Sequence, residues 1–182
     1  MGNVLFVYDE IFGNNKVEVV DVGTGSGAIA ISLDLEEQNM NVIATDISKE
    51  ALEVAKDNNK KLNANVEFYL GNMLEPLKGK KFDILVSNPP YIPSEEIVDS
   101  LVLDNEPHVA LFGGEDGLKF YRQILMNANT ILNKKNIIAF EHAYDKGKEM
   151  EDLARTYFPN SDIRLFKDLQ GKDRMTIIVN GG

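Results

Sequence analysis

The segment Asn88-Pro89-Pro90-Tyr91 carries the residue types that can hold a planar –NH2 group for chemistry. An Asn side-chain oxygen and the carbonyl groups of the turn can accept its two hydrogens, and the aromatic ring can cover its face. The segment follows an apolar run, residues 82–87, that is typical of a buried strand. Proline has no N–H, so two prolines must end that strand. The alternative is a rigid turn without a ligand, and the segment alone does not decide between the two.

A second group of chemically useful residues is the glycine-rich segment Asp21-Val22-Gly23-Thr24-Gly25-Ser26-Gly27. The β-branched residues 17–22 lead into it and predict a strand, while the apolar spacing over 26–38 predicts a helix. A glycine-rich turn between strand and helix lets a ligand approach the backbone and presents free N–H groups. The helix dipole also favours negative ligand groups at this position.

Asp46 ends the next predicted strand, 41–46. It follows Gly23 by about 20 residues, which is the spacing expected of a ribose-binding acid. Two ligand classes fit the glycine turn: a dinucleotide, since Gly23-x-Gly25-x-x-Ala28 satisfies that fingerprint, or the nucleoside of S-adenosylmethionine. An NAD-dependent oxidoreductase would lack an evident hydride-transfer acid and would leave the Asn-Pro-Pro-Tyr turn unexplained. The combination therefore favours a methyltransferase.

Strands and helices that would position these residues alternate along the chain. Strands are predicted at 17–22, 41–46, 66–71, 82–87, 136–141, 161–166 and 174–179, and helices at 26–38, 48–63, 117–132 and 145–157. Ser48 is expected to cap its helix. This alternation predicts an α/β fold with a doubly wound, seven-stranded, mostly parallel sheet and a C-terminal antiparallel hairpin. The long connection 91–116 is expected to form a wall of the substrate pocket, or else a surface excursion with a short helix at 94–102.

Length and composition limit the function classes. The 182 residues suit one domain, 1–182, in which 1–16 is an atypical N-terminal segment. Cysteine is absent and only two histidines occur, so disulfides, cysteine nucleophiles and a metal site are not expected. We find no membrane span and no signal peptide, and we expect a cytoplasmic protein. The net charge of −10 argues against direct nucleic-acid binding, which depends on Lys and Arg.

With these motifs, the chain resembles the catalytic domain of the protein-(glutamine-N5) methyltransferases that modify peptide chain release factors. The resemblance covers about residues 17–179. Further segments that share the family's motifs are Thr45-Asp46-Ile47-Ser48, Glu106-Pro107, the segment 110–118, Tyr121-Arg122, Glu141-His142 and the segment 168–174. The family also has a helical N-terminal domain and an Arg-Pro-x-Thr-Glu segment before the first strand. Neither matches the residues before Val17, so we expect a catalytic domain without that helical domain.

The resemblance implies S-adenosylmethionine as cofactor, a class I release factor as protein partner and no metal. The cofactor residues that it implies are Asp21, Gly23, Thr24, Gly25, Ser26 and Gly27 around the methionyl part, Asp46 and Ile47 at the ribose, Asn72 and Met73 at the adenine, and Asn88. Asn88, Pro89, Pro90 and Tyr91 would form the glutamine pocket, with Asn88, Pro89 and Tyr91 catalytic. The family usually has an acid in place of Asn72, so we expect a weaker hydrogen bond to the adenine amino group here.

An amide nitrogen is a poor nucleophile, so the expected mechanism is positioning. The Asn88 side-chain oxygen and the Pro89 carbonyl would accept the two amide hydrogens, and Tyr91 would pack on the amide. Alternatives are an N6-adenine methyltransferase acting on DNA or RNA, glutamine methylation of a ribosomal protein, and a cofactor-binding module without activity. For Glu141 and His142 we expect a supporting role, and for Asp173-Arg174 a local ion pair or turn clamp.

Overall fold

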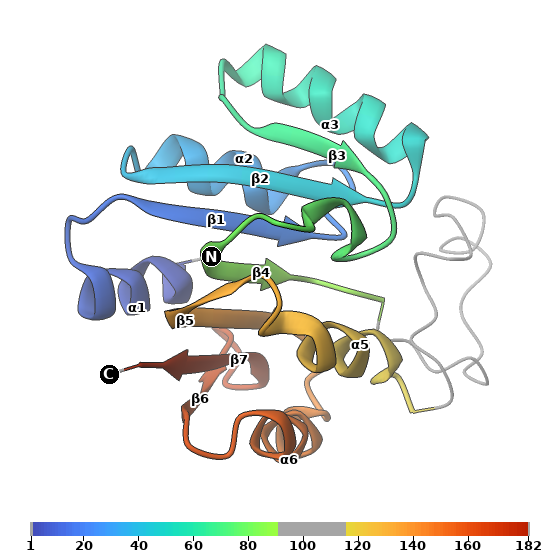
Figure 1. Cartoon of the computed structure of the whole chain (residues 1–182). Coiled ribbons are helices and arrows are strands. Elements are labelled where there is room, and N and C mark those ends of the chain that lie inside the picture. The colour runs from blue at the N-terminus through green and yellow to red at the C-terminus, as the bar shows by residue number, and fades with distance from the viewer. Residues whose placement is uncertain (1, 91–115, 182) are drawn as a thin grey trace.

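The computed structural model of the chain describes residues 2–90 and 116–181. Seven strands form one sheet in the order β3-β2-β1-β4-β5-β7-β6 (Figure 1). The strands are β1 (Val17–Val22), β2 (Met40–Asp46), β3 (Glu67–Leu70), β4 (Phe82–Ser87), β5 (Leu132–Glu141), β6 (Asp162–Lys167) and β7 (Asp173–Asn180). β1 to β5 are parallel, and β7 runs antiparallel to both β5 and β6. The predicted sheet and its terminal hairpin are confirmed.

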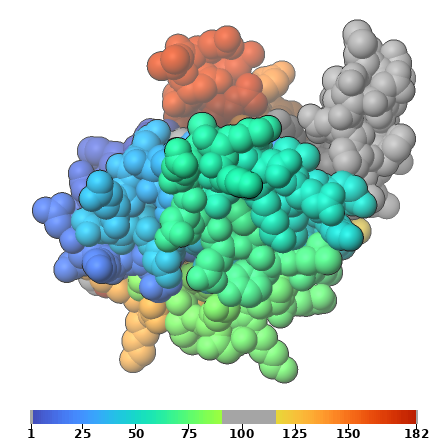
Figure 2. Space-filling model, turned by 90° about the horizontal axis from the view of Figure 1, so that it is seen from above, coloured from blue at the N-terminus to red at the C-terminus, as the bar shows by residue number. Residues whose placement is uncertain are grey.

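Helices cover both faces of this sheet. They are α1 (Gly2–Phe12), α2 (Ala28–Glu36), α3 (Lys49–Leu62), the short 3-10 helix η1 (Glu75–Leu77), α5 (Lys119–Ala128) and α6 (Gly147–Tyr157). α1 and α2 pack on one face, and η1, α5 and α6 pack on the other. Figure 2 looks onto the β3 side of the molecule, where α3 forms the outer surface and α2 lies beside it. None of the helices in the described ranges is long and apolar enough to cross a membrane.

The core consists of two apolar layers that follow the alternation of side chains along each strand. In β1, Val19 points into the layer under α1 and α2, while Val20 points into the layer under α5 and α6. Both side chains are fully buried. Burial on both faces explains why the central strands read as continuous apolar runs in the sequence.

α1 was not predicted from the sequence, which suggested no element before Val17. The helix buries Val4, Val7, Tyr8 and Phe12 against the sheet. These positions follow the i, i+3, i+4 spacing of an amphipathic helix, so the signal was present although the helix is only eleven residues long. One face of the helix that residues 2–12 form is therefore part of the core.

The largest differences from the predicted element boundaries lie between α5 and β5. The helix predicted to end at 132 ends at Ala128, and β5 begins at Leu132 instead of 136. The register with β4 shifts between Phe82 and Ile84, so the exposed residues 133–135 form an irregular start of the strand. Because their sequence is Asn-Lys-Lys, the apolar pattern that predicts a strand is missing at these positions. By contrast, the predicted cap is confirmed, because the Ser48 side chain accepts a 3.1 Å hydrogen bond from the Ala51 N–H.

Candidate active site

The glycine-rich turn joins β1 to α2 at the carboxyl edge of the sheet. Gly23, Gly25 and Gly27 all adopt left-handed backbone conformations, with φ of 72°, 57° and 84°. A Cβ at Gly27 would lie 2.9 Å from the Ile31 side chain and 3.1 Å from that of Ala55, so this glycine permits close helix packing. A Cβ at Gly23 or Gly25 would meet nothing within 4 Å. These two positions therefore leave open space along the backbone.

Backbone hydrogen bonds tie this turn to the end of β2. The N–H groups of Gly23 and Thr24 both donate to the Thr45 carbonyl, at 2.9 and 3.0 Å. Asp46 accepts from the Gly25 N–H at 2.8 Å with one carboxylate oxygen and from the Ser48 N–H at 2.9 Å with the other. Each oxygen keeps further acceptor capacity. The predicted ribose acid therefore lies against the turn and is already oriented.

Asp21 is a buried carboxyl group with an incomplete set of partners. Its Oδ2 accepts a 2.6 Å hydrogen bond from the Thr24 hydroxyl, whereas Oδ1 has no partner within the described part of the chain. Burial raises the pKa of this carboxyl to about 6, although the hydrogen bond from the Thr24 hydroxyl opposes the rise. The charge of Asp46 raises it further. A buried oxygen without a partner is costly, and a ligand with a hydrogen-bond donor would relieve that cost.

The residues after β3 lie next to the end of β2. The Gly71 N–H donates to the Asp46 carbonyl at 2.9 Å, and the Thr45 hydroxyl donates to the Met73 carbonyl at 3.1 Å. Met73 is held in a left-handed conformation with φ of 48°. Asn72 is exposed. The predicted adenine residues are thus attached to the strand that carries Asp46.

The Asn-Pro-Pro turn leaves the sheet at the end of β4. The Ser87 hydroxyl donates a 2.6 Å hydrogen bond to the Val22 carbonyl, which ties the end of β4 to the end of β1. Pro89 is buried and anchors the turn, whereas Asn88 is exposed. Tyr91 and the predicted pocket wall up to residue 115 lie outside the described residues.

The strand order brings these predicted residues to one edge. β3, β2, β1 and β4 are consecutive neighbours, and the turns after them carry Asn72, Asp46, Gly23 to Gly27 and Asn88 in that order (Figure 1). In an open parallel sheet, ligands bind at this edge where the strand order reverses. Here the reversal falls between β1 and β4.

Residues 5–113 match the Methyltransferase small domain family. The chain belongs to this methyltransferase family. The match begins inside α1, so the helix that sequence reasoning missed is part of the family's domain. The methyltransferase core thus includes the layer that α1 forms.

Two relatives extend this result. The release factor glutamine methyltransferase of Bacillus subtilis is 48% identical over 177 residues, which cover 94% of this chain and 62% of the relative. The enzyme of the same name from Bacillus anthracis is 46% identical over 168 residues, which cover 90% of this chain and 59% of the relative. The chain thus spans about 60% of the length of these relatives, and the predicted resemblance is confirmed.

A solved structure supports the fold. A methyltransferase from Pyrococcus furiosus superimposes with a TM-score of 0.72 at 20% identity, over 98% of this chain and 82% of that chain. At this identity the likeness speaks for the fold alone. It agrees with the predicted class I methyltransferase sheet.

In this methyltransferase, His142 has a structural position at the junction of β5 and β7. It is fully buried, with Nδ1 2.9 Å from the Ala143 carbonyl and Nε2 3.0 Å from the Thr176 hydroxyl. Since a carbonyl only accepts, Nδ1 carries the hydrogen and the hydroxyl can donate to Nε2. Burial lowers the pKa of His142 and favours this neutral form. The contacts fit the supporting role expected from the sequence.

The segment 168–174 forms a clamped turn between β6 and β7. Arg174 pairs with Asp168 at 3.1 Å, so of the two expected alternatives, a local ion pair or a turn clamp, the structure has the clamp, with Asp168 as the partner of Arg174. Asp168 also accepts from the backbone N–H groups of Gln170 and Lys172. The adjacent residues of a β-strand point to opposite sides, which is why Arg174 reaches across the turn instead.

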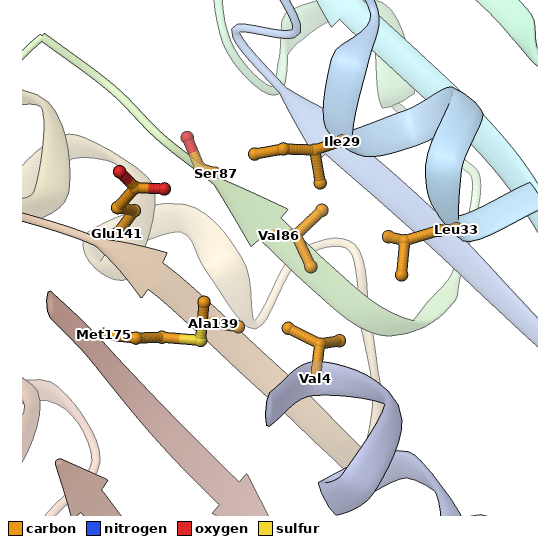
Figure 3. Close-up of a pocket in the computed structure, with 8 residues that line it drawn as sticks. All are labelled: Val4, Ile29, Leu33, Val86, Ser87, Ala139, Glu141 and Met175. Carbon is orange, nitrogen blue, oxygen red and sulfur yellow. The ribbon is translucent and has the colours of Figure 1, made fainter. Parts of the chain in front are cut away.

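A small cavity lies between α1, α2 and the ends of β4, β5 and β7, and sequence reasoning did not identify it. Its volume is about 50 Å³. It is lined by Val4, Ile29, Leu33, Val86, Ser87, Ala139, Glu141 and Met175 (Figure 3). These residues come from five elements spread over the chain, so no local sequence signal could have found it.

Proposed function

We propose that this chain transfers a methyl group from S-adenosylmethionine to the side-chain amide nitrogen, N5, of the glutamine in the Gly-Gly-Gln motif of peptide chain release factors. The observation that carries the proposal is the placement of the Asn88-Pro89-Pro90 turn. It leaves β4 beside the glycine-rich turn of β1, and the Ser87–Val22 hydrogen bond ties the two strand ends together. The names of the relatives, which are 46% and 48% identical, support the same specificity.

The residues along this edge fit S-adenosylmethionine. The unpartnered Oδ1 of Asp21 would receive a hydrogen bond directly or through water from the ammonium group of the methionyl part, and Gly23 and Gly25 leave room for it. Asp46 would accept hydrogen bonds from the ribose hydroxyls, with Asn72 and Met73 beside the adenine. Ser26, Thr24 and Ile47 would complete the cofactor site. When bound, S-adenosylmethionine supplies a methyl group activated by its sulfonium.

The protein's contribution to the reaction is to position the acceptor amide. The Asn88 side-chain oxygen and the Pro89 carbonyl would each accept one hydrogen of the glutamine –NH2. These two hydrogen bonds would orient the amide nitrogen toward the methyl group and would stabilise the positive charge that develops on the nitrogen as the new bond forms. Tyr91 would pack on the amide, and the surplus proton would leave to water. Pro90 would hold the turn rigid, because its ring fixes φ.

Charge and cell location follow from this proposal. The net charge of −10 supports a protein acceptor instead of a nucleic acid, whose phosphates require basic side chains. Release factors act in the cytoplasm, so we place the reaction there. We also propose that residues 1–182 act as one domain, since a single sheet runs through the described residues.

The test is mass spectrometry of a class I release factor after incubation with this chain and S-adenosylmethionine. One added methyl group on the glutamine of the Gly-Gly-Gln peptide is the expected result. Cofactor binding without any methylation would leave a binding module that lacks activity and would contradict the proposal. Methylation of adenine in a parallel incubation with DNA or RNA would instead favour an N6-adenine methyltransferase.

A further inference from the structure

The cavity between α1 and the ends of β4 and β5 contains one carboxylate. Glu141, the last residue of β5, lines it and is half-buried. The other lining residues are apolar except Ser87, whose hydroxyl is engaged with the Val22 carbonyl. Figure 3 shows the Glu141 carboxylate on the side of the cavity where Ser87 lies. The cavity therefore offers a hydrogen-bond acceptor at one end and apolar walls elsewhere.

The side-chain carboxylate of Glu141 has no hydrogen-bond or ion-pair partner among residues 2–90 and 116–181, although the Glu141 backbone carbonyl accepts a 2.7 Å hydrogen bond from the Tyr121 hydroxyl. Three basic groups close in sequence to the end of β5 or the start of β7 are engaged elsewhere: Arg174 pairs with Asp168, Lys146 pairs with Glu149, and Lys172 lies 4.6 Å from the Tyr144 ring. A partly buried carboxylate that no basic group in the described ranges neutralises favours a ligand that brings its own donor.

The strand order places this carboxylate on the acceptor side of the site. The residues proposed for the cofactor follow β1, β2 and β3, whereas β5 lies on the other side of β4. In the β4–β5 register, Val86 pairs with Ala139 and Ser87 with Phe140, so Asn88 comes next to Glu141. Neighbouring strands are about 4.8 Å apart, which is within reach of one peptide unit.

The size of the cavity limits what can enter. A cavity of about 150 Å³ admits a benzene ring, so a volume near 50 Å³ admits a group of only a few heavy atoms. A peptide unit without a side chain fits that description, and a purine ring does not. In the proposed reaction, Asn88 and Pro89 already accept both hydrogens of the side-chain amide. The donor left for Glu141 is a backbone N–H.

We infer that this cavity is an acceptor subsite, in which Glu141 accepts a hydrogen bond from a backbone N–H of the Gly-Gly-Gln segment and the apolar walls enclose the glycine unit next to it. The inference rests on the proposed function. It makes the cavity a determinant of specificity, because a side chain in place of that glycine would not fit it.

The experiment measures the Kd of a Gly-Gly-Gln peptide by fluorescence anisotropy, with S-adenosylhomocysteine present to fill the cofactor site. Glu141→Leu removes the acceptor and should weaken peptide binding about tenfold, while Glu141→Gln keeps a neutral acceptor and should weaken it less. The affinity for S-adenosylhomocysteine, measured by calorimetry, and the melting temperature should stay unchanged. Glu36→Leu, at an exposed glutamate in the last turn of α2, is the matched control and should change none of these values.

A second series identifies the donor. Peptides with a backbone N-methyl group at each of the three residues in turn lose one N–H each. One of these peptides should bind the unaltered protein about tenfold more weakly than the parent peptide does. The same peptide and the parent peptide should bind the Glu141→Leu variant equally well, as expected when the two altered groups are in direct contact.

Other results would overturn the inference. The first is an unchanged peptide Kd in Glu141→Leu. The second is a loss of S-adenosylhomocysteine affinity in that variant as large as its loss of peptide affinity. The third is that, for every N-methylated peptide, the loss of affinity from the N-methyl group adds to the loss from Glu141→Leu. If the unaltered protein binds the peptide in this Glu141-dependent way but does not methylate it, the proposed function fails and the subsite stands. If it does not bind the peptide, both fail.

Discussion

The backbone N–H of Gly25 donates a 2.8 Å hydrogen bond to the Asp46 carboxylate, across 21 residues of sequence. This bond joins the glycine-rich turn after β1 to the end of β2. The same carboxylate accepts from the Ser48 N–H at 2.9 Å, where α3 begins. One side chain therefore fixes the relative positions of the two parts of the site proposed to bind the methionyl group and the ribose.

Asp46→Ala should weaken S-adenosylmethionine binding by roughly 10- to 100-fold, because it removes a charged acceptor for two ribose hydroxyls and leaves the Gly25 N–H without its partner. Isothermal titration calorimetry with S-adenosylmethionine measures the effect. Asp57→Ala, an exposed carboxylate on α3, is the control and should bind normally. Full affinity in Asp46→Ala would remove this residue from the cofactor site.

Gly27→Ala and Gly25→Ala should separate stability from binding. At Gly27, the added methyl group meets Ile31 and Ala55 in a left-handed backbone, so we expect a loss of about 2 kcal/mol or more in the free energy of unfolding. At Gly25, the added methyl group meets no other atom, so only the left-handed backbone conformation lowers the free energy of unfolding, by about 1 kcal/mol. The methyl group would, however, occupy space proposed for the cofactor. Urea unfolding and cofactor titration should therefore rank the two variants in opposite orders. The same order in both measurements would contradict these assignments.

Asn88→Ala should lower kcat about 10²- to 10³-fold, because it removes a preorganised acceptor for the amide whose charge develops in the transition state. The Kd of S-adenosylmethionine should change little. Asn129→Ala, at the exposed C-terminal end of α5, controls for a general effect of losing an Asn side chain. Unchanged turnover in Asn88→Ala would contradict the positioning mechanism.

The buried Asp21 predicts a specific pH dependence of stability. Its pKa of about 6 in the folded protein lies above the usual aspartate value of about 3.9, so well below pH 4 both states are protonated and the ionisation of Asp21 does not affect stability. As pH rises from about 4 to 6, the unfolded chain loses its proton first, and folding loses up to about 3 kcal/mol. Asp21→Asn should therefore melt at a higher temperature than the unaltered protein at pH 7, with a much smaller gain at pH 4.

The comparison is made by thermal unfolding of both proteins from pH 4 to pH 8 without cofactor. The same substitution should weaken S-adenosylmethionine binding, since it replaces the carboxylate proposed to face the ammonium group. An equal difference in Tm at every pH would show that the effect does not come from ionisation. Stability gained together with affinity lost would mark Asp21 as a residue kept for binding.

Much of the site was predictable because its signals are local. Left-handed backbone conformations are indicated by Gly23, Gly25 and Gly27. Two prolines end a strand, and Asp46 lies at the end of an apolar run. Each of these signals depends on backbone sterics within a few residues. The parallel sheet follows in the same way from the alternation of strands and helices.

Other features depend on contacts that sequence reading does not reach. The irregular start of β5 is set by its pairing with β4, and the clamp on Asp168 comes from Arg174 instead of from a sequence neighbour. α1 carries an amphipathic pattern too short to stand alone, and its burial against the sheet is what makes it a helix of the core.

The sequence by itself therefore determined the residue types on which the proposed chemistry rests: a glycine turn proposed for a nucleoside cofactor, an acid proposed for its ribose and an Asn-Pro-Pro turn proposed for a planar amide. Only the tertiary structure decided which groups remain without partners. Within the described part of the chain, the oxygen of Asp21 and the carboxylate of Glu141 that have no partner become visible only once the strands are ordered side by side. The reason is that residue type and local geometry are encoded along the chain, whereas partners and cavities arise between segments that are distant in sequence.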